Sequence, residues 1–445
     1  MNIIPALLFA IVIATLDGST SSLVANFIIL GIGLLYTFRV DNKWRKNSLN
    51  LLSITYVIYI TLSFVYSQEF LNGGSFYSGD SIKYINFYLN SKDVSFDFER
   101  LSMYYVASEG KDVLYHELLR VFCGFANLYL GGATVYYMTL IETLFGVLSS
   151  MTLYLILSEK YGKAAFKYTL LFSVFSYFLL YSCFIVRDIV IAYLFVEALR
   201  IVLGKFNFKN LGVLLLLIIL SIGIRLQSGL FMTLYFVLYI YNAAKQTKYK
   251  VLANTIFIVV LAAAFIALSS SVIYEDSLTD LAEHQEETVE RQQEIGGLFN
   301  MFFKLPFGIR QIAIMFFSQI APFPPYGVLA EAHNFTEATI GLHVIICEIF
   351  WFLISYSLII CLFNKKTRFV LSNFDFFLLG VAAALLLLLT VHPDIRRMIP
   401  VYPIIYLSYI KIAETLPRSK MSRIKGGLIV SYIFLLLVYF SIKGF

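Results

Sequence analysis

The sequence predicts an all-α fold, a polytopic helical bundle embedded in a membrane. The 445 residues are 59% hydrophobic and only 14% charged, whereas soluble proteins carry roughly 25% charged residues. The deficit of charge extends along the whole chain, and no linker rich in Pro, Gly and Ser divides it. We therefore expect a single integral membrane domain over residues 1–445.

Apolar runs of membrane-spanning length recur along the chain. A spanning helix needs about 20 mostly apolar residues, and we expect roughly 12–14 such helices, one or two of them short. The runs cover 3–17, 22–38, 50–67, 134–158, 166–186, 188–203, 210–224, 228–243, 251–273, 338–363, 374–391, 398–413 and 426–443. The stretches 113–130 and 309–325 are apolar but interrupted, which is typical of re-entrant or interfacial segments.

The connectors between the runs are of two kinds. Six short ones are rich in Lys and Arg: "RVDNKWRKN", "SEKYGKAAFK", "GKFNFKN", "AAKQTKYK", "NKKTR" and "PRSKMSRIK". The positive-inside rule places these connectors, and the N-terminus, in the cytoplasm. The loops 68–112 and 274–337 and the turns at Arg187, Arg225 and 392–397 are then extracytoplasmic.

Several arginines interrupt apolar sequence on the side predicted to be extracytoplasmic. A charge at membrane depth costs roughly 2.5–3.5 kcal/mol, so it needs a partner or a function. Guanidinium groups that meet at one face would bind polyanionic oxygens such as phosphate. The predicted anion-binding residues are Arg187, Arg225, Arg310, Arg396 and Arg397, with His392 beside the last two. The alternatives are snorkelling to the interface or a private Arg187–Asp188 pair.

The first extracytoplasmic loop contains "GGSFYSGDSIKYINFYLN". Its Asp80, Tyr84 and Tyr88 recur at i, i+4 and i+8, which places them on one face of a short helix. A carboxylate beside tyrosines can bind a sugar, because the carboxylate accepts hydrogen bonds from the sugar hydroxyls and the rings cover its C–H faces. The carboxylate can also act as a general base. The alternative is a helix-capping aspartate on an interfacial helix.

His333, in "EAHNFTEATIGLHVIICEIFWFLI", is a second candidate base because it opens a helix from the outer side. We expect His116, His284 and His343 to be structural, since no neighbouring residues indicate chemistry. Four cysteines lie within or beside apolar runs without the spacing of a metal site or a disulfide framework. The sequence therefore predicts neither a metal nor a cofactor.

The order of these segments resembles the EpsG/Wzy-type bacterial polysaccharide polymerases over residues 80–345. An Asp with a following Tyr in an early outer loop corresponds to Asp80 and Tyr84. An Arg that opens a later helix before an Ile-Ala step corresponds to Arg187, and a basic residue before a small-residue pair corresponds to Arg225. Relatives of the EpsG type usually have His at the position of Arg225. The start of the helix after His333 is similar to that of O-antigen ligases and polymerases.

The resemblance implies a GT-C-like, metal-independent glycosyltransferase in the bacterial cytoplasmic membrane. It would polymerise undecaprenyl-diphosphate-linked repeat units into O-antigen, capsule or exopolysaccharide at the outer face. The resemblance implies a chain-length regulator and a flippase as partners. It does not imply binding to nucleic acid. Two alternatives stay open: another lipid-linked glycosyltransferase of the GT-C kind, and a lipid-linked oligosaccharide flippase or transporter.

Overall fold

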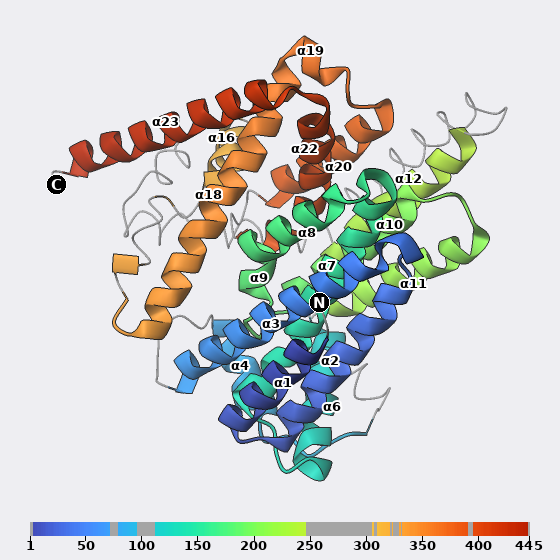
Figure 1. Cartoon of the computed structure of the whole chain (residues 1–445), viewed down its shortest axis with the longest axis vertical. Helices are drawn as coiled ribbons and strands as arrows, with labels where there is room; N and C mark the ends of the chain where they lie inside the picture. Colours follow the sequence, from blue (N-terminus) through green and yellow to red (C-terminus); the bar gives the residue numbers. More distant parts are fainter. Residues whose placement is uncertain are drawn as a thin grey trace. The chain divides into compact units, whose positions relative to one another are not determined.

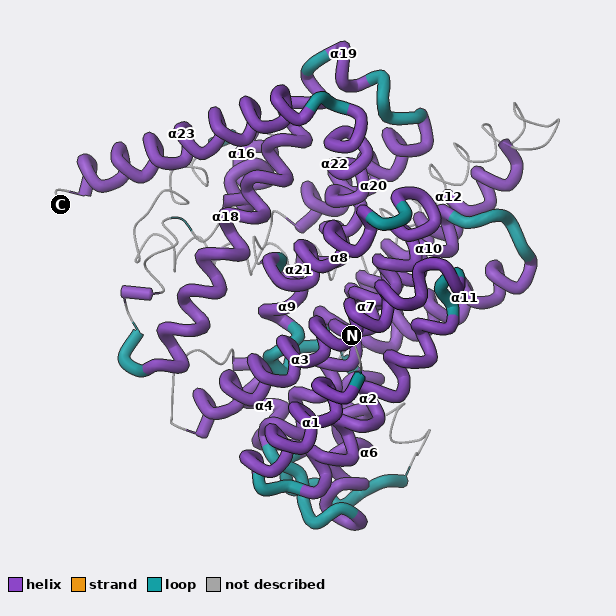
Figure 2. Tube along the Cα trace, viewed as in Figure 1, coloured by secondary structure: helices purple, strands orange, loops and turns teal. Residues whose placement is uncertain are grey.

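The computed structural model describes residues 3–71, 79–95, 112–245, 305–306, 309–320, 323, 329–330, 332–389 and 395–443. Every regular element within these ranges is a helix (Figures 1 and 2), which confirms the all-α prediction. The expected span 251–273, most of the loop 274–337 and the predicted anion ligand His392 lie outside the described residues.

Five of the described helices are long and apolar enough to cross a membrane. They are α2 (Thr20–Phe38), α3 (Asn42–Leu71), α7 (Val135–Tyr161), α18 (Phe335–Phe363) and α23 (Arg418–Lys443). Shorter apolar helices are α1 (Ile4–Asp17), α8 (Ala164–Phe175), α11 (Phe208–Ile224), α16 (Ile309–Phe317) and α20 (Asn373–Leu389). The chain is a multi-pass membrane protein.

The chain divides into two compact units. The first unit comprises Met1–Leu203, Val213–Met232 and Phe323–Phe350, and the second comprises Gly204–Gly212, Thr233–Pro322 and Trp351–Phe445. The prediction of a single domain stays a prediction, because a division by contact density does not measure whether the units fold independently.

Helix α7 forms the centre of the first unit. It packs against α2, α3, α8 and α10 (Asp188–Leu203), and most of its side chains are buried. Gly146 lets a neighbouring helix approach closely, since a Cβ there would lie 2.6 Å from Cε1 of Tyr59 on α3. The hydroxyls of Ser63 and Thr143 lie 2.6 Å apart and join α3 to α7 within this core.

Helix α10 separates two polar ends of the first unit. Asp188 lies in its first turn and Arg200 in its last turn, about 20 Å apart for a helix of this length. Near the C-terminal end, Glu197 binds both Arg39 at 2.9 Å and Arg200 at 2.7 Å. Residues that we expect outside, such as Arg187, and residues that we expect inside, such as Arg39, therefore lie at opposite ends of α10.

The second unit is held together by a buried aromatic pair. Trp351 of α18 stacks on Tyr402 of α22 (Tyr402–Thr415) with ring centroids 3.6 Å apart. The Trp351 Nε1 donates a hydrogen bond to Gln319 Oε1 at 2.8 Å. Lys411 of α22 forms an ion pair with Asp375 in the first turn of α20.

Two predicted boundaries are wrong. The span 166–186 is interrupted at Ser176, whose extended backbone (ψ 164°) ends α8 and whose Oγ accepts a hydrogen bond from the Phe178 N–H at the start of α9 (Tyr177–Tyr181). The stretch 113–130 is one helix, α6 (Val113–Tyr129), and its re-entrant or interfacial character stays a prediction. The basic connector "PRSKMSRIK" is helical from Arg418 onward, because Lys and Arg are good helix formers.

Candidate functional site

One helix of the first unit, α4, carries the predicted sugar-binding residues and packs against α6. In α4 (Gly79–Tyr88), Tyr84 and Tyr88 are 3% and 7% exposed and face α6, and Asp80 lies in the first turn. The Tyr88 hydroxyl lies 2.6 Å from His116 Nδ1 of α6. The rings of Tyr84 and His116 meet edge to face at 5.2 Å. The period of four residues thus buries two tyrosines against α6.

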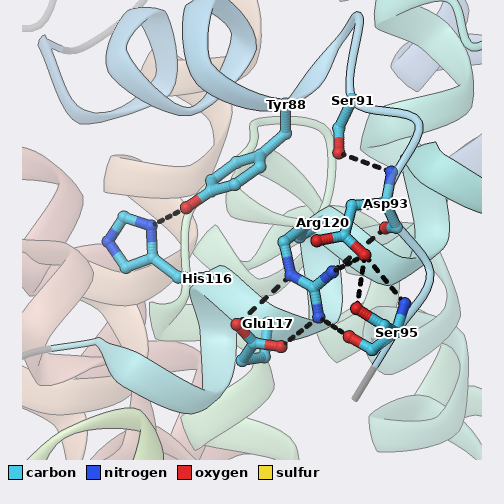
Figure 3. A network of polar contacts seen from close by, with 7 residues as sticks. All are labelled: Tyr88, Ser91, Asp93, Ser95, His116, Glu117 and Arg120. Carbon is cyan, nitrogen blue, oxygen red and sulfur yellow. Dashed lines mark hydrogen bonds and ion pairs between the residues drawn. The ribbon is translucent and has the colours of Figure 1, made fainter. Parts of the chain in front are cut away.

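Residues 89–95, here called the strap, follow α4 and lie against α6, and Arg120 of α6 holds this segment (Figure 3). The Arg120 Nη1 lies 2.9 Å from Asp93 Oδ1 and donates to the Asp93 carbonyl at 3.1 Å. The Nη2 of the same residue donates to the Ser95 carbonyl and to Glu117 Oε2. One guanidinium therefore satisfies backbone and side-chain acceptors of the strap.

The next turns of α6 complete this contact. Asn127 Nδ2 donates to the carbonyls of Leu89 at 2.8 Å and Ser91 at 2.7 Å. A Cβ on Gly124 would lie 2.8 Å from the Asp93 carbonyl carbon, so only glycine lets the strap approach here. Residues 120, 124 and 127 share one face of the helix, and that face fixes the position of the strap after α4.

The Glu117–Arg120 ion pair is buried, with 2% and 5% of the two side chains exposed. Both Glu117 oxygens accept from Arg120, at 3.2 Å and 2.5 Å. An ion pair out of water is costly unless its remaining donors are satisfied, and the strap carbonyls supply those acceptors. The strap carbonyls thus stabilise the buried ion pair, and Arg120 in turn holds the strap in place.

Arg187 lies in an irregular buried segment, 182–187, between α9 and α10. Two buried backbone carbonyls of this segment accept hydrogen bonds from neighbouring helices: Ser81 Oγ of α4 donates to the Ile185 carbonyl at 3.0 Å, and Thr143 Oγ1 of α7 donates to the Ser182 carbonyl at 3.2 Å. The Arg187 guanidinium forms an ion pair with Asp112, the residue before α6. Helices α4, α6 and α7 together hold this segment.

Asp112 joins Arg187 to Tyr84. The Tyr84 hydroxyl donates to Asp112 Oδ2 at 3.0 Å, and the same oxygen accepts from Arg187. Burial raises the pKa of Tyr84 to about 12, although the nearby Arg187 charge opposes the shift and the Asp80 and Asp188 charges add to it. Tyr84 therefore stays protonated at neutral pH and acts as a donor.

Arg225 occupies the junction between α11 and α12 (Leu226–Lys245), the position of a predicted turn. Its Nη1 lies 3.1 Å from Asp188 Oδ1, in the first turn of α10. Asp188 is 6% and Arg225 15% exposed at the side chain. The private Arg187–Asp188 pair considered from the sequence is wrong: Arg187 pairs with Asp112, and Asp188 pairs with Arg225.

Together these residues form one polar cluster at the N-terminal end of α10. Its members are Asp80, Tyr84, Asp112, Arg187, Asp188 and Arg225. Each of the two guanidinium groups is paired with a carboxylate, and Asp80 leaves the cluster with three aspartates against two arginines, so an anion would be bound through guanidinium N–H groups that do not contact these carboxylates. The carboxylates hold the guanidinium planes in a fixed orientation. The cluster has the parts needed to bind a phosphate group and to donate to or accept from hydroxyl groups.

His333 belongs to a different part of the first unit. Its backbone N–H donates to Glu337 in the first turn of α18, and Asn334 Oδ1 accepts from the Glu337 N–H at 2.8 Å. Glu337 in turn faces the buried Glu69 at the end of α3. The described contacts of His333 are thus with the start of its own helix.

The remaining predicted ligands belong to the second unit. Arg310 lies at the start of α16, and Arg396 and Arg397 lie in α21 (Ile395–Met398). Each unit is described by itself, and a role for these three arginines stays a prediction.

Asp112 in the cluster and His116 beside it were not among the site residues predicted from the sequence. Asp112 precedes the helix "VLYHELL", and Asp followed by a helical pattern is an ordinary capping signal. His116, one turn later, was expected to be structural, and its contacts with Tyr84 and Tyr88 place it beside the cluster. A helix assignment for 113–129 would have shown that both residues project from the first turns of the same helix.

Among the described residues, no group of three or more His, Cys, Asp and Glu side chains is arranged to hold a metal ion. The prediction of metal independence stays a prediction. Comparison with known proteins found no family model, no curated protein and no solved structure that matches the chain.

Proposed function

We propose that this chain is a glycosyltransferase that polymerises undecaprenyl-diphosphate-linked oligosaccharide repeat units at the outer face of the bacterial cytoplasmic membrane. The observation that carries the proposal is the grouping of Arg187 and Arg225 with Asp80 and Tyr84 in one cluster. These residues come from three distant parts of the chain. Placing such charges between apolar helices is costly even when they are paired, and buried charged clusters are often functional.

The arginines supply the electrostatic part of the reaction. Arg187 and Arg225 bind the donor diphosphate and stabilise the negative charge that develops as it leaves. Asp112 and Asp188, which pair with them, orient the two guanidinium groups before the donor arrives. Pre-oriented donors stabilise a transition state without having to reorganise during the reaction.

The remaining predicted residues bind and activate the sugars. Tyr84 offers a ring edge and a hydroxyl donor to a sugar, and Asp80 or His333 is the base expected from the sequence for the acceptor hydroxyl. Arg310, His392, Arg396 and Arg397 are the further anion-binding residues expected from the sequence. The proposal includes no metal or other cofactor. A chain-length regulator and a flippase are its expected partners.

The test is a reaction of the purified protein in liposomes with a lipid-diphosphate-linked repeat unit, in the presence of EDTA. The expected product is a ladder of lipid-linked chains that differ by one repeat unit. Wild-type protein that yields only movement of the substrate between leaflets would contradict the proposal and favour the transporter. Addition of a single sugar would favour another lipid-linked glycosyltransferase.

A matched control distinguishes the cluster from a general effect of arginine loss. Arg200 is also paired with a carboxylate and is also part-buried, but it lies at the opposite end of α10. Arg187→Ala should abolish the ladder, whereas Arg200→Ala should leave its length distribution unchanged in protein that reaches the membrane in equal amount.

A further inference from the structure

Only one of the two carboxylate oxygens of Asp112 has a partner within the protein. Its Oδ2 accepts from Tyr84 at 3.0 Å and pairs with Arg187. Its Oδ1 is buried and has no hydrogen-bond partner. The Nε–H of Arg187 is likewise buried without a partner. An acceptor and a donor of the same ion pair are thus both left unsatisfied.

Buried polar atoms without partners are rare, and each one requires an explanation. A hydroxyl group donates one hydrogen bond and accepts others, so it is the kind of group that can satisfy an acceptor and a donor of this type. A phosphate dianion accepts from Arg187 but cannot donate to Asp112. The pair of unsatisfied atoms therefore matches an alcohol better than it matches a bare anion.

We propose that Asp112 is the general base of the reaction and that its Oδ1 accepts the proton of the acceptor sugar's hydroxyl. This inference rests on the proposed polymerase function. It replaces Asp80 and His333 in that role. Arg187, which touches the same carboxylate, connects the base to the diphosphate-binding side of the cluster.

The backbone at Asp112 fixes the direction of this carboxylate. Its φ is 69°, and it is the one non-glycine residue with positive φ among the described parts of the chain. Aspartate and asparagine adopt this conformation more readily than other residues with a Cβ. The helix that follows and the Tyr84 hydrogen bond then hold the side chain in place.

Neighbouring carboxylates are engaged differently. Asp188 Oδ1 is held by Arg225, and both oxygens of Glu117 are held by Arg120. Protonation would weaken the ion pair of each of these carboxylates, Asp112 included, and Asp112 is distinguished from them by a buried oxygen without a hydrogen-bond partner. Asp112 keeps one oxygen for the substrate while its other oxygen anchors the side chain.

The proposed step transfers one sugar chain and one proton. The acceptor hydroxyl oxygen forms a bond to the anomeric carbon of the donor, and its proton passes to Asp112 Oδ1. The bond between the anomeric carbon and the diphosphate oxygen breaks, and its electron pair leaves with the lipid diphosphate. Arg187 and Arg225 stabilise the charge on that leaving group.

The test compares Asp112→Asn with wild type in the liposome reaction. Asparagine accepts the Tyr84 hydrogen bond and tolerates positive φ, but it does not take up a proton. We expect kcat to fall by about 10²–10⁴-fold, as is typical for loss of a general base. Donor binding should be no weaker than in wild type, because the variant removes a negative charge from beside Arg187.

Asp112→Gly, which suits the same backbone conformation, decides the question if the asparagine variant does not reach the membrane. Asp17→Asn is the control, since the Asp17 carboxylate is hydrogen-bonded to Ser22 and Thr134 away from the cluster. It should retain the wild-type kcat.

The outcomes separate the base from the function. If wild-type protein forms no polymer, the proposed function is wrong. If wild type polymerises and Asp112→Asn keeps its kcat, the function stands and the assignment of the base is wrong. Weaker donor binding with unchanged kcat would likewise overturn the base and make Asp112 a residue that positions Arg187.

Discussion

Arg225 Nη1 lies 3.1 Å from Asp188 Oδ1, so the junction between α11 and α12 is tied to the first turn of α10. This contact brings a second arginine to the end of α10 at which Arg187 pairs with Asp112. Two arginines that are 38 residues apart in the chain thereby share one cluster. The proposed chemistry depends on this arrangement.

Replacement of either arginine by lysine should lower activity without removing it. Lysine keeps the charge but cannot bind two phosphate oxygens with a planar fork. We expect Arg187→Lys and Arg225→Lys each to reduce the rate of chain extension by about tenfold or more, which corresponds to about 1.4 kcal/mol. The rate is measured from the ladder in liposomes. Full activity of both lysine variants would show that a point charge is enough, and the bidentate contact would be wrong.

Loss of Arg120 should destabilise the protein. Arg120→Met leaves the buried Glu117 carboxylate without its partner, which costs about 3–5 kcal/mol, and releases the strap. The measurement is thermal unfolding of the purified protein in detergent.

The double variant Arg120→Met/Glu117→Leu provides the control for this prediction. It should recover part of the lost stability, because a buried pair replaced as a whole by apolar side chains leaves no uncompensated charge. No recovery in the double variant would mean that the contacts with the strap, rather than the ion pair, account for the loss.

Gly124→Ala should displace the strap. The added methyl would lie 2.8 Å from the Asp93 carbonyl carbon, and a backbone atom cannot move aside cheaply. We expect a loss of about 1–3 kcal/mol, as for other overpacked sites. Gly31→Ala, where nothing lies within 4 Å of the new Cβ, should be neutral or stabilising by about 0.5–1 kcal/mol. Similar melting temperatures for the two variants would argue against the tight approach.

The stability of the protein should depend on the protonation of His116. Burial, with a smaller contribution from the Lys83 charge, lowers the pKa of His116 from 6.5 to about 4. Between these values the unfolded chain binds a proton that the folded protein does not bind, so stability falls as the pH is lowered through this range. It is fully present above pH 6.5.

His116→Asn tests this dependence, since asparagine still accepts a hydrogen bond from Tyr88 but does not titrate. The melting temperature of wild type should fall further than that of the variant between pH 7 and about pH 5. An equal or smaller loss in wild type would show that His116 titrates near its ordinary pKa in the folded protein.

Composition and apolar periodicity predicted the all-α class and most helix positions, because the need to satisfy backbone groups in lipid leaves few alternatives. They also placed Tyr84 and Tyr88 on one face of α4. Composition and periodicity could not predict which residues pair with the arginines. Asp112 is separated from Arg187 by 75 residues, and no local pattern in the sequence encodes a contact over that distance.

The break at Ser176 was missed for a related reason. Residues 166–186 are mostly apolar, and their serines are scattered at 173, 176 and 182, so hydropathy gives no clear sign of an end at Ser176. The break is set by one serine that caps α9 and by the packing of segment 182–187 against α4 and α7. Tertiary contacts, rather than local propensity, decide the path of the chain before Arg187.

The most direct test of the central claim is a binding measurement. A polyprenyl diphosphate and the corresponding polyprenyl alcohol are titrated into purified wild-type protein, Arg187→Ala/Arg225→Ala and Arg200→Ala. We predict that wild type and Arg200→Ala prefer the diphosphate and that the double variant binds the two lipids alike. Equal preference for the diphosphate in all three proteins would show that the cluster at the end of α10 is not where the anion binds.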